Sequence, residues 1–194
     1  MILEGIVTTL NEDGSPNISP MGPEVDVPLT RFVLKPYQTS RTYQNLKRVG
    51  EGVLHVTDDV ELIARAAINQ FDEPPATFPA TAVRGVVLAD ACRWYAFRVA
   101  NLDDRDERTR IECNVIDEGR IRDFFGFNRA KHAVLEAAIL ATRTKFLPRS
   151  EVSEALARLR VAVDKTAGEV ERQAFELLVR HIDSAYTHSA HAPD

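Results

Sequence analysis

The uneven distribution of proline and glycine constrains this 194-residue sequence more than any other feature. Eight of the ten prolines come before residue 80, whereas only Gly126 and Gly168 are found after residue 120. Long helices exclude proline and disfavour glycine, while turns and strand ends use both residues. We therefore expect a β-rich N-terminal part and a helical C-terminal part, which together make an α+β fold.

The N-terminal part has the pattern of short strands separated by turns. Residues 3–10 form the first expected strand, and Asp13-Gly14 can supply the positive φ that a tight hairpin requires. The returning strand at 17–21 contains Pro20, which restricts it to a sheet edge or to a place where strand pairing opens. Further strands are expected at 30–34, 52–57, 94–101 and 109–116, and short helices at 39–48 and 59–70.

From Asn128 onward, the apolar residues recur with the period of a helix. A first helix would end before Pro148, a second would begin with Ser150 as its cap, and a third would begin with a Thr166–Glu169 capping box. We expect these three helices to form a compact bundle or a helical arm, with frayed final residues. The predicted domains are residues 1–125 and 126–194.

Charge and cysteine content exclude several classes of protein. The chain has 24 Lys and Arg against 29 Asp and Glu, so it lacks the basic excess that binding along a nucleic-acid backbone requires. No apolar run has the length of a bilayer span, and the N-terminus does not resemble a signal peptide. Two cysteines are too few for a disulfide scaffold, and no His, Cys or carboxylate spacing resembles a metal site. We expect a cytoplasmic protein without nucleic-acid, membrane or metal partners.

The first candidate binding segment runs from Thr39 to Asn45, at the expected start of a helix. The first turn of a helix carries unpaired N–H groups and a partial positive charge, so added hydroxyls and the Arg41 guanidinium would suit a phosphate. Thr42 and Asn45 are three residues apart, so they share one helix face and could act on one ligand. The alternative is a well-capped surface helix, because Ser and Thr are common caps.

The second candidate segment is the end of the proline-containing strand. Pro20 removes one N–H from the strand pairing, and Gly22 allows the backbone to approach a flat group closely. Such a strand end can present backbone groups to a planar heterocycle. The alternative is a proline-rich exit from the strand that binds nothing.

Taken together, these segments resemble the FMN-binding split β-barrel, the fold of flavin reductase-like and pyridoxamine-phosphate-oxidase-like proteins. Within this group, the sequence is most similar to the family called domain of unknown function 447. The similar stretches are Gly5–Thr9, Arg41–Leu46 and Phe127–Lys131, the last of which leads into a helix. The resemblance implies a split β-barrel with a C-terminal helical subdomain, noncovalent FMN, and a homodimer with the cofactor at its interface.

The same resemblance implies which residues would bind FMN. Thr39, Arg41 and Thr42 would hold the phosphate, with Ser40 supporting the turn and Asn45 reaching the phosphate or the ribityl chain. Ser19, Met21 and Gly22 would line the isoalloxazine, mainly through backbone groups.

Asn128, Arg129 and Lys131 form a further candidate site, because a helix cap flanked by two cations could hold an anion. We assign them as substrate contacts because the resemblance extends through them; the alternative is a cap with two solvated cations. The resemblance implies an FMN-binding redox protein or flavin-dependent oxidoreductase of unknown substrate. The alternatives are a non-catalytic flavin or deazaflavin binder, acting as carrier, sensor or assembly partner, and a scaffold without flavin.

Overall fold

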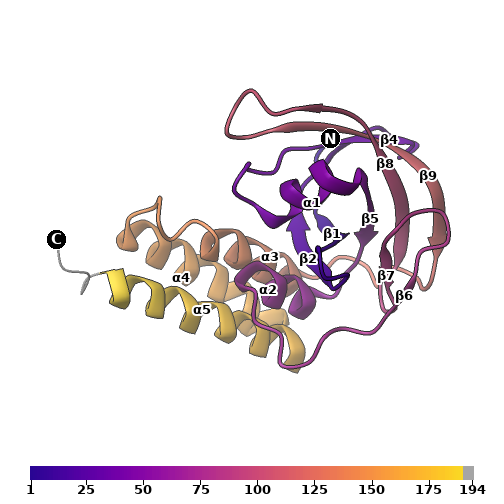
Figure 1. The fold of residues 1–194 in the computed structure, drawn as a ribbon. Helices are drawn as coiled ribbons and strands as arrows, with labels where there is room; N and C mark the ends of the chain where they lie inside the picture. Colours follow the sequence, from indigo (N-terminus) through magenta and orange to yellow (C-terminus); the bar gives the residue numbers. More distant parts are fainter. Residues whose placement is uncertain (190–194) are drawn as a thin grey trace. The chain divides into compact units, whose positions relative to one another are not determined.

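The computed structural model describes residues 1–189. The final residues, for which we expect fraying, lie outside the described part of the chain. The chain forms two compact units (Figure 1). The first comprises Met1–Thr57 and Glu73–Phe124, and the second comprises Asp58–Asp72 and the residues from Phe125 onward. The predicted division placed 58–72 in the first domain, whereas these residues group with the C-terminal helices.

The first unit is a curled antiparallel sheet of seven strands in the order β2-β1-β5-β8-β9-β4-β3. These strands are β1 (Gly5–Leu10), β2 (Pro16–Met21), β3 (Glu24–Val25), β4 (Arg31–Leu34), β5 (Glu51–Val56), β8 (Arg93–Asp103) and β9 (Arg110–Arg120). The backbone N–H of Val25 donates to the Met1 carbonyl at 2.8 Å, and that of Leu3 donates to the Pro23 carbonyl at 3.0 Å. The segment before β1 therefore lies beside β3 and curls the sheet toward closure, which confirms the predicted β-rich N-terminal part.

The β1–β2 hairpin forms as its sequence predicts. The N–H of Asn11 donates to the Ser15 carbonyl at 2.9 Å, and the N–H of Gly14 donates to the Asn11 carbonyl at 3.1 Å. Gly14 has a φ of 83°, the left-handed conformation that glycine adopts without strain. Because the register of the two strands follows from this turn, the turn also fixes which β2 side chains face the inside of the sheet.

Helix α1 (Arg41–Val49) lies on the concave side of the curled sheet (Figure 1). Its Tyr43 and Leu46 are buried in one hydrophobic core with Val7 of β1 and Phe97 of β8. The helix ends at Gly50, whose φ of 71° is the usual left-handed C-cap. Burial of one helix face thus fixes the position of the α1 N-terminus within the first unit.

The strands β6 (Thr77–Pro79) and β7 (Val86–Leu88) form a two-stranded sheet, in which β7 packs against β1 and β5. His55 joins the layers, because its Nε2 accepts the Leu88 N–H at 3.0 Å and its Nδ1 lies 3.2 Å from the Ile6 carbonyl. The side chain is fully buried, and this burial lowers the pKa of His55 to about 4. His55 is therefore neutral near pH 7 and has a structural role.

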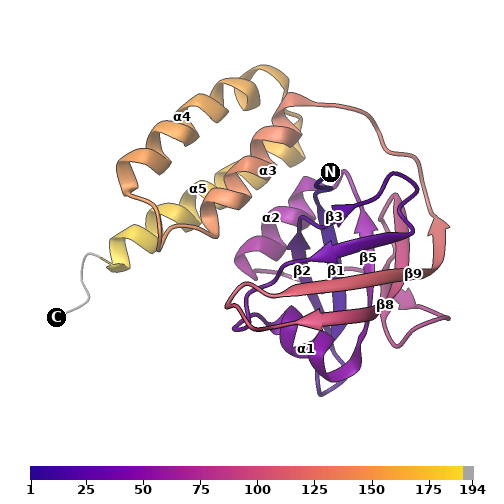
Figure 2. The same ribbon diagram turned by 90° about the horizontal axis from the view of Figure 1, so that it is seen from above.

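Within residues 58–72 and 125–189, the second unit has four helices, in which α4 lies alongside α3 and α5 (Figure 2). They are α2 (Val60–Ile68), α3 (Arg129–Ala141), α4 (Arg149–Thr166) and α5 (Glu169–Ser189). Helix α2 packs on α3 and α5 and buries Leu62, Ile63 and Ala66. No described helix is both long enough and apolar enough to cross a membrane.

The caps of α4 and α5 differ from the prediction. Ser150 lies inside α4, whose N-cap is Pro148 without a side-chain hydrogen bond. Thr166 also belongs to α4, where its hydroxyl donates to the Ala162 carbonyl at 2.8 Å. The N–H of Gly168 instead donates to Glu171 at 2.9 Å. The predicted capping box of Thr166 and Glu169 is therefore wrong, because each of the two bonded residues lies two positions further along the chain.

Candidate functional site

The N-terminus of α1 combines a cap with free hydrogen-bond donors. The Ser40 hydroxyl accepts the Tyr43 N–H at 3.2 Å, and the first turn contains no acidic residue. Thr39 and Arg41 are exposed beside this turn, and the Arg41 side chain makes no hydrogen bond or ion pair within residues 1–189. The partial positive charge of the helix end and the Arg41 guanidinium therefore favour an anion here.

Thr42 and Asn45 share one helix face, as predicted, but this face packs against β1 and β2. They are 2% and 5% exposed, respectively. Asn17 donates from Nδ2 to the Thr42 hydroxyl at 3.1 Å, while Asn45 donates to the Thr9 hydroxyl and to Asn11 Oδ1, both at 3.0 Å. These bonds attach α1 to the hairpin. Contact of Thr42 and Asn45 with a ligand remains a prediction.

A depression of about 530 Å³ lies between the β1–β2 turn and α1. Its lining residues are Asn11, Glu12, Asp13 and Ser15 from the hairpin, and Arg41, Gln44, Asn45 and Arg48 from the helix. Arg48 is occupied by protein acceptors, since it donates to the Leu10 carbonyl and to Asn45 Oδ1, the latter at 3.3 Å.

Asp13 lies on the hairpin side of this depression. Hydrogen bonds from the Ser15 side chain and backbone lower the pKa of Asp13, and the nearby Arg41 charge adds to this effect. Sequence reasoning treated Asp13 only as a turn residue and missed Glu12, Gln44 and Arg48. The available signal was the i, i+3, i+7 spacing of Arg41, Gln44 and Arg48 on one polar helix face.

The other predicted segment lies on the same strand that contacts α1. Ser19 and Met21 follow Asn17 at intervals of two residues, so the three side chains share one face of β2 at steps of about 7 Å. Ser19 and Met21 are half-buried, and Met21 packs against the core of the sheet. Gly22 is exposed, but a Cβ there would come within 3.0 Å of both Glu4 and Ile2.

The pairing of β2 with β1 corrects one expectation about this segment. Proline has no N–H, so Pro16 and Pro20 occupy the positions where the strands do not exchange hydrogen bonds. Because these positions alternate, the backbones of Ser19 and Met21 are hydrogen-bonded to β1. Their side chains, not their backbone groups, are available to a ligand, and Gly22 alone of the three lies beyond the paired strand.

The predicted substrate residues lie in the helical unit, where two of them have structural roles. Asn128 caps α3 by accepting the N–H groups of Ala130 and Lys131 at 2.8 and 3.1 Å, and it donates to the Thr166 carbonyl at 3.1 Å. Lys131 donates to the Asp58 carbonyl at 2.9 Å and lies 3.7 Å from the Asp58 carboxylate. Arg129 is exposed. A substrate-binding role for the three remains a prediction.

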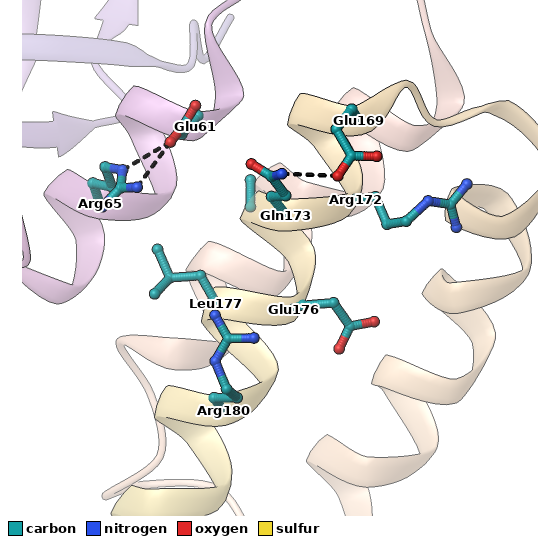
Figure 3. A pocket seen from close by; sticks show the side chains of 9 residues that line it. Glu61, Arg65, Glu169, Arg172, Gln173, Glu176, Leu177 and Arg180 are labelled. Carbon is teal, nitrogen blue, oxygen red and sulfur yellow. Dashed lines mark hydrogen bonds and ion pairs between the residues drawn. The ribbon is translucent and has the colours of Figure 1, made fainter.

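A second depression, of about 410 Å³, lies between α2 and α5 (Figure 3). Glu61 and Arg65 of α2 are ion-paired at 2.9 Å, and Gln173 donates to Glu169 at 2.8 Å. Three arginines and three glutamates line it, so their charges cancel. This balance favours no particular class of ligand.

Family comparison adds independent information about the chain. Residues 3–122 match the family model described as the N-terminal domain of the protein of unknown function DUF447. Residues 128–180 match the second model of that family. The chain belongs to the DUF447 family. A search among curated proteins finds no match to this DUF447 protein.

Three solved structures with a similar fold are described as FMN-bound or as flavin reductases. An FMN-bound DUF447 protein from Methanosarcina mazei has a TM-score of 0.78 at 23% identity, covering 93% of this chain and 94% of its own. The styrene monooxygenase flavin reductase from Pseudomonas putida S12 has a TM-score of 0.52 at 13% identity, covering 61% and 80%. A flavin reductase domain protein from Arthrobacter sp. FB24 has a TM-score of 0.55 at 15% identity, covering 63% and 80%. The predicted fold, a flavin reductase-like split β-barrel with a C-terminal helical region, is confirmed.

Proposed function

We propose that this DUF447 protein binds FMN noncovalently through its first unit and serves in a redox reaction. The observation that carries the proposal is the match with the FMN-bound M. mazei protein, which spans 93% of this chain and includes the helical region. Flavin reductases of the same fold support the redox part of the proposal.

The phosphate end of the cofactor fits the N-terminus of α1. Thr39 and Arg41 are exposed there, and the first turn of the helix has N–H groups but no carboxylate. An anion at this place would gain charge-assisted hydrogen bonds without competition from an acid in the same turn. Thr42 and Asn45 would support the phosphate site by holding α1 against the hairpin.

The ring end fits the face of β2 that continues from this point. Asn17 contacts Thr42 of α1, and Ser19 and Met21 extend the same face over about 14 Å. An elongated molecule with a phosphate at one end and a ring system at the other matches such a strip. When bound, FMN would supply hydride or electron transfer, while Ser19, Met21 and Gly22 would position its ring.

Absorption spectroscopy tests the cofactor. The purified protein is mixed with excess FMN and desalted, and a retained flavin spectrum is the expected result. A colourless protein would contradict the proposal and leave deazaflavin binding or a scaffold role. Anaerobic addition of NADH or NADPH then separates the two roles, because bleaching of bound flavin supports a reductase and unchanged absorption supports a carrier or sensor.

We also propose the homodimer that the family resemblance implies. Light scattering of the FMN-loaded protein should give twice the mass of the 21.7 kDa chain. A monomer that retains flavin would contradict the dimer without affecting the cofactor assignment.

A further inference from the structure

We propose that the free edge of β2 binds the pyrimidine edge of the flavin ring. The Ile18 N–H would donate to a ring carbonyl, and the Ile18 carbonyl would accept the N3–H of the ring. The inference rests on the proposed function, because it requires a flavin ring to lie beside β2. It adds a backbone contact to the side-chain contacts of Ser19 and Met21.

The hairpin turn determines which β2 backbone groups point away from β1. Strand β2 lies at one end of the seven-stranded sheet, so it pairs with β1 along one edge only. The Asn11 N–H donates to the Ser15 carbonyl at 2.9 Å, so this pair exchanges hydrogen bonds across the hairpin. Such pairs alternate along antiparallel strands, so Asn17 and Ser19 bond to β1 whereas the backbone of Ile18 points to the free edge.

Ile18 is the one backbone donor at this edge between residues 16 and 20. Its N–H and its carbonyl have no hydrogen-bond partner within residues 1–189. Pro16 and Pro20 occupy the neighbouring outward positions, where they present carbonyls but have no N–H. The N–H and carbonyl of a single strand residue lie close together on one side of the strand. They can therefore bind a ligand that presents an acceptor beside a donor.

The two prolines also argue against another protein strand as the partner of this edge. A strand added to β2 would find no donor at Pro16 or Pro20, so only Ile18 of these three outward residues could exchange both hydrogen bonds with it. Proline on an edge strand is a common means of preventing such pairing. A small planar ligand needs the two groups of one residue only, so this edge favours a ligand over a second copy of the strand.

The flavin ring carries the complementary groups. Its N3–H lies between two carbonyl groups, so a donor and an acceptor are adjacent whichever carbonyl faces the strand, and hydrogen bonds of this kind orient a flavin. The β2 residues from Asn17 to Met21 are half-buried. The side chains of Ser19 and Met21 lie toward one face of the sheet and those of Ile18 and Pro20 toward the other. A ring that extends the plane of the sheet would therefore have side chains along both of its faces.

The test removes one hydrogen bond from the protein and one from the ligand. Ile18→Pro removes the backbone donor, whereas N3-methylated FMN lacks the ring donor. Pro16 and Pro20 show that β2 accommodates proline at its outward positions, so Ile18→Pro should fold, and thermal unfolding checks this. Ile18→Ala is the matched control, because it also loses the isoleucine side chain but keeps the N–H.

Fluorescence titration measures the dissociation constants. Wild type should bind N3-methylated FMN about threefold to tenfold more weakly than FMN, which corresponds to the net value of one hydrogen bond. Ile18→Pro should bind FMN about threefold to tenfold more weakly than Ile18→Ala does. Ile18→Pro should weaken the binding of riboflavin by the same factor, because the contact is with the ring and not with the phosphate.

The possible failures are distinguishable. Equal affinities of Ile18→Pro and Ile18→Ala for FMN would overturn the contact while leaving FMN binding intact. If Ile18→Pro does not fold, wild type decides, because equal affinities for FMN and its N3-methylated form would also overturn the contact. Failure of wild type to bind either FMN or riboflavin would overturn the proposed function and this inference together.

Discussion

At the scale of single residues, Arg41 offers the most direct test of the phosphate site. Arg41→Ala should weaken FMN binding by about 1.5–3 kcal/mol, the range for hydrogen bonds to charged groups, and should leave riboflavin binding unchanged. The fold should not suffer, because the Arg41 side chain is exposed and makes no hydrogen bond within the described residues. Fluorescence titration with both flavins measures the difference. Equal losses for FMN and riboflavin would place the phosphate elsewhere, and Arg41→Lys should retain part of the FMN affinity.

His55 predicts a pH dependence of stability. Its pKa is about 4 in the folded protein against an ordinary value of 6.5, because burial disfavours the imidazolium. As pH falls below 6.5 the unfolded chain therefore binds a proton first, and the free energy of unfolding should decrease between pH 6.5 and 4 by at most about 1.4 kcal/mol per unit. Urea unfolding across this range measures the slope. His55→Gln should be less stable at neutral pH but lack this part of the slope, and an identical slope in the variant would contradict the assignment.

At the scale of elements, the attachment of α1 to the hairpin makes a separate prediction. Asn45→Ala would remove the bonds to Thr9 and Asn11 from a buried position, so we expect a loss of about 1–3 kcal/mol in the free energy of unfolding. Gln44→Ala is the matched control, because Gln44 is exposed on the same helix and should change stability by less than about 0.5 kcal/mol. Chemical denaturation of the two variants checks the difference. Equal stability would show that the buried bonds contribute nothing net.

The same element shows what sequence reasoning can and cannot provide. The helix start at Ser40-Arg41 and the Asp13-Gly14 turn follow from local chemistry, so both were predictable. The spacing of Thr42 and Asn45 predicts that they share one helix face, but it does not predict that β1 and β2 pack against this face. A helical period shows which residues lie together and not what they contact. A ligand and a hairpin strand offer such side chains the same kind of hydrogen bond. The inward direction of Thr42 and Asn45 is therefore a property of tertiary packing.

Other elements differ from prediction for similar reasons. Strands β3, β6 and β7 have only two or three residues, which is too short for an alternating pattern to be recognised. The start of α5 was misplaced because α4 continues through Thr166, and packing extends helices beyond their local signals. Most strands and helices with long regular patterns were predicted within a few residues, but α3 ends at Ala141 and does not continue to Pro148.

At the scale of the whole molecule, the structure shows which apolar surface a C-terminal deletion would expose. The sequence places α2 between β5 and β6, but α2 belongs to the helical unit, where Leu62, Ile63 and Ala66 are buried. A chain ending at residue 125 would retain α2 and lose α3 and α5, the helices that cover this face. Exposed apolar surface of this kind promotes association, so we expect the truncated protein to aggregate on size-exclusion chromatography.

Substitution in α2 identifies the cause of this aggregation. Leu62→Gln and Ile63→Gln in the truncated chain would make the exposed face polar without adding charge, and should restore a monodisperse species. The same substitutions in the full chain should destabilise it, by about 2–5 kcal/mol for each large apolar core side chain lost, because there the face is buried. A truncated chain that is monodisperse without substitution would show that α2 needs no cover. Aggregation that persists after substitution would show that the barrel itself requires the helical unit, which would make the two units one folding unit despite their separate cores.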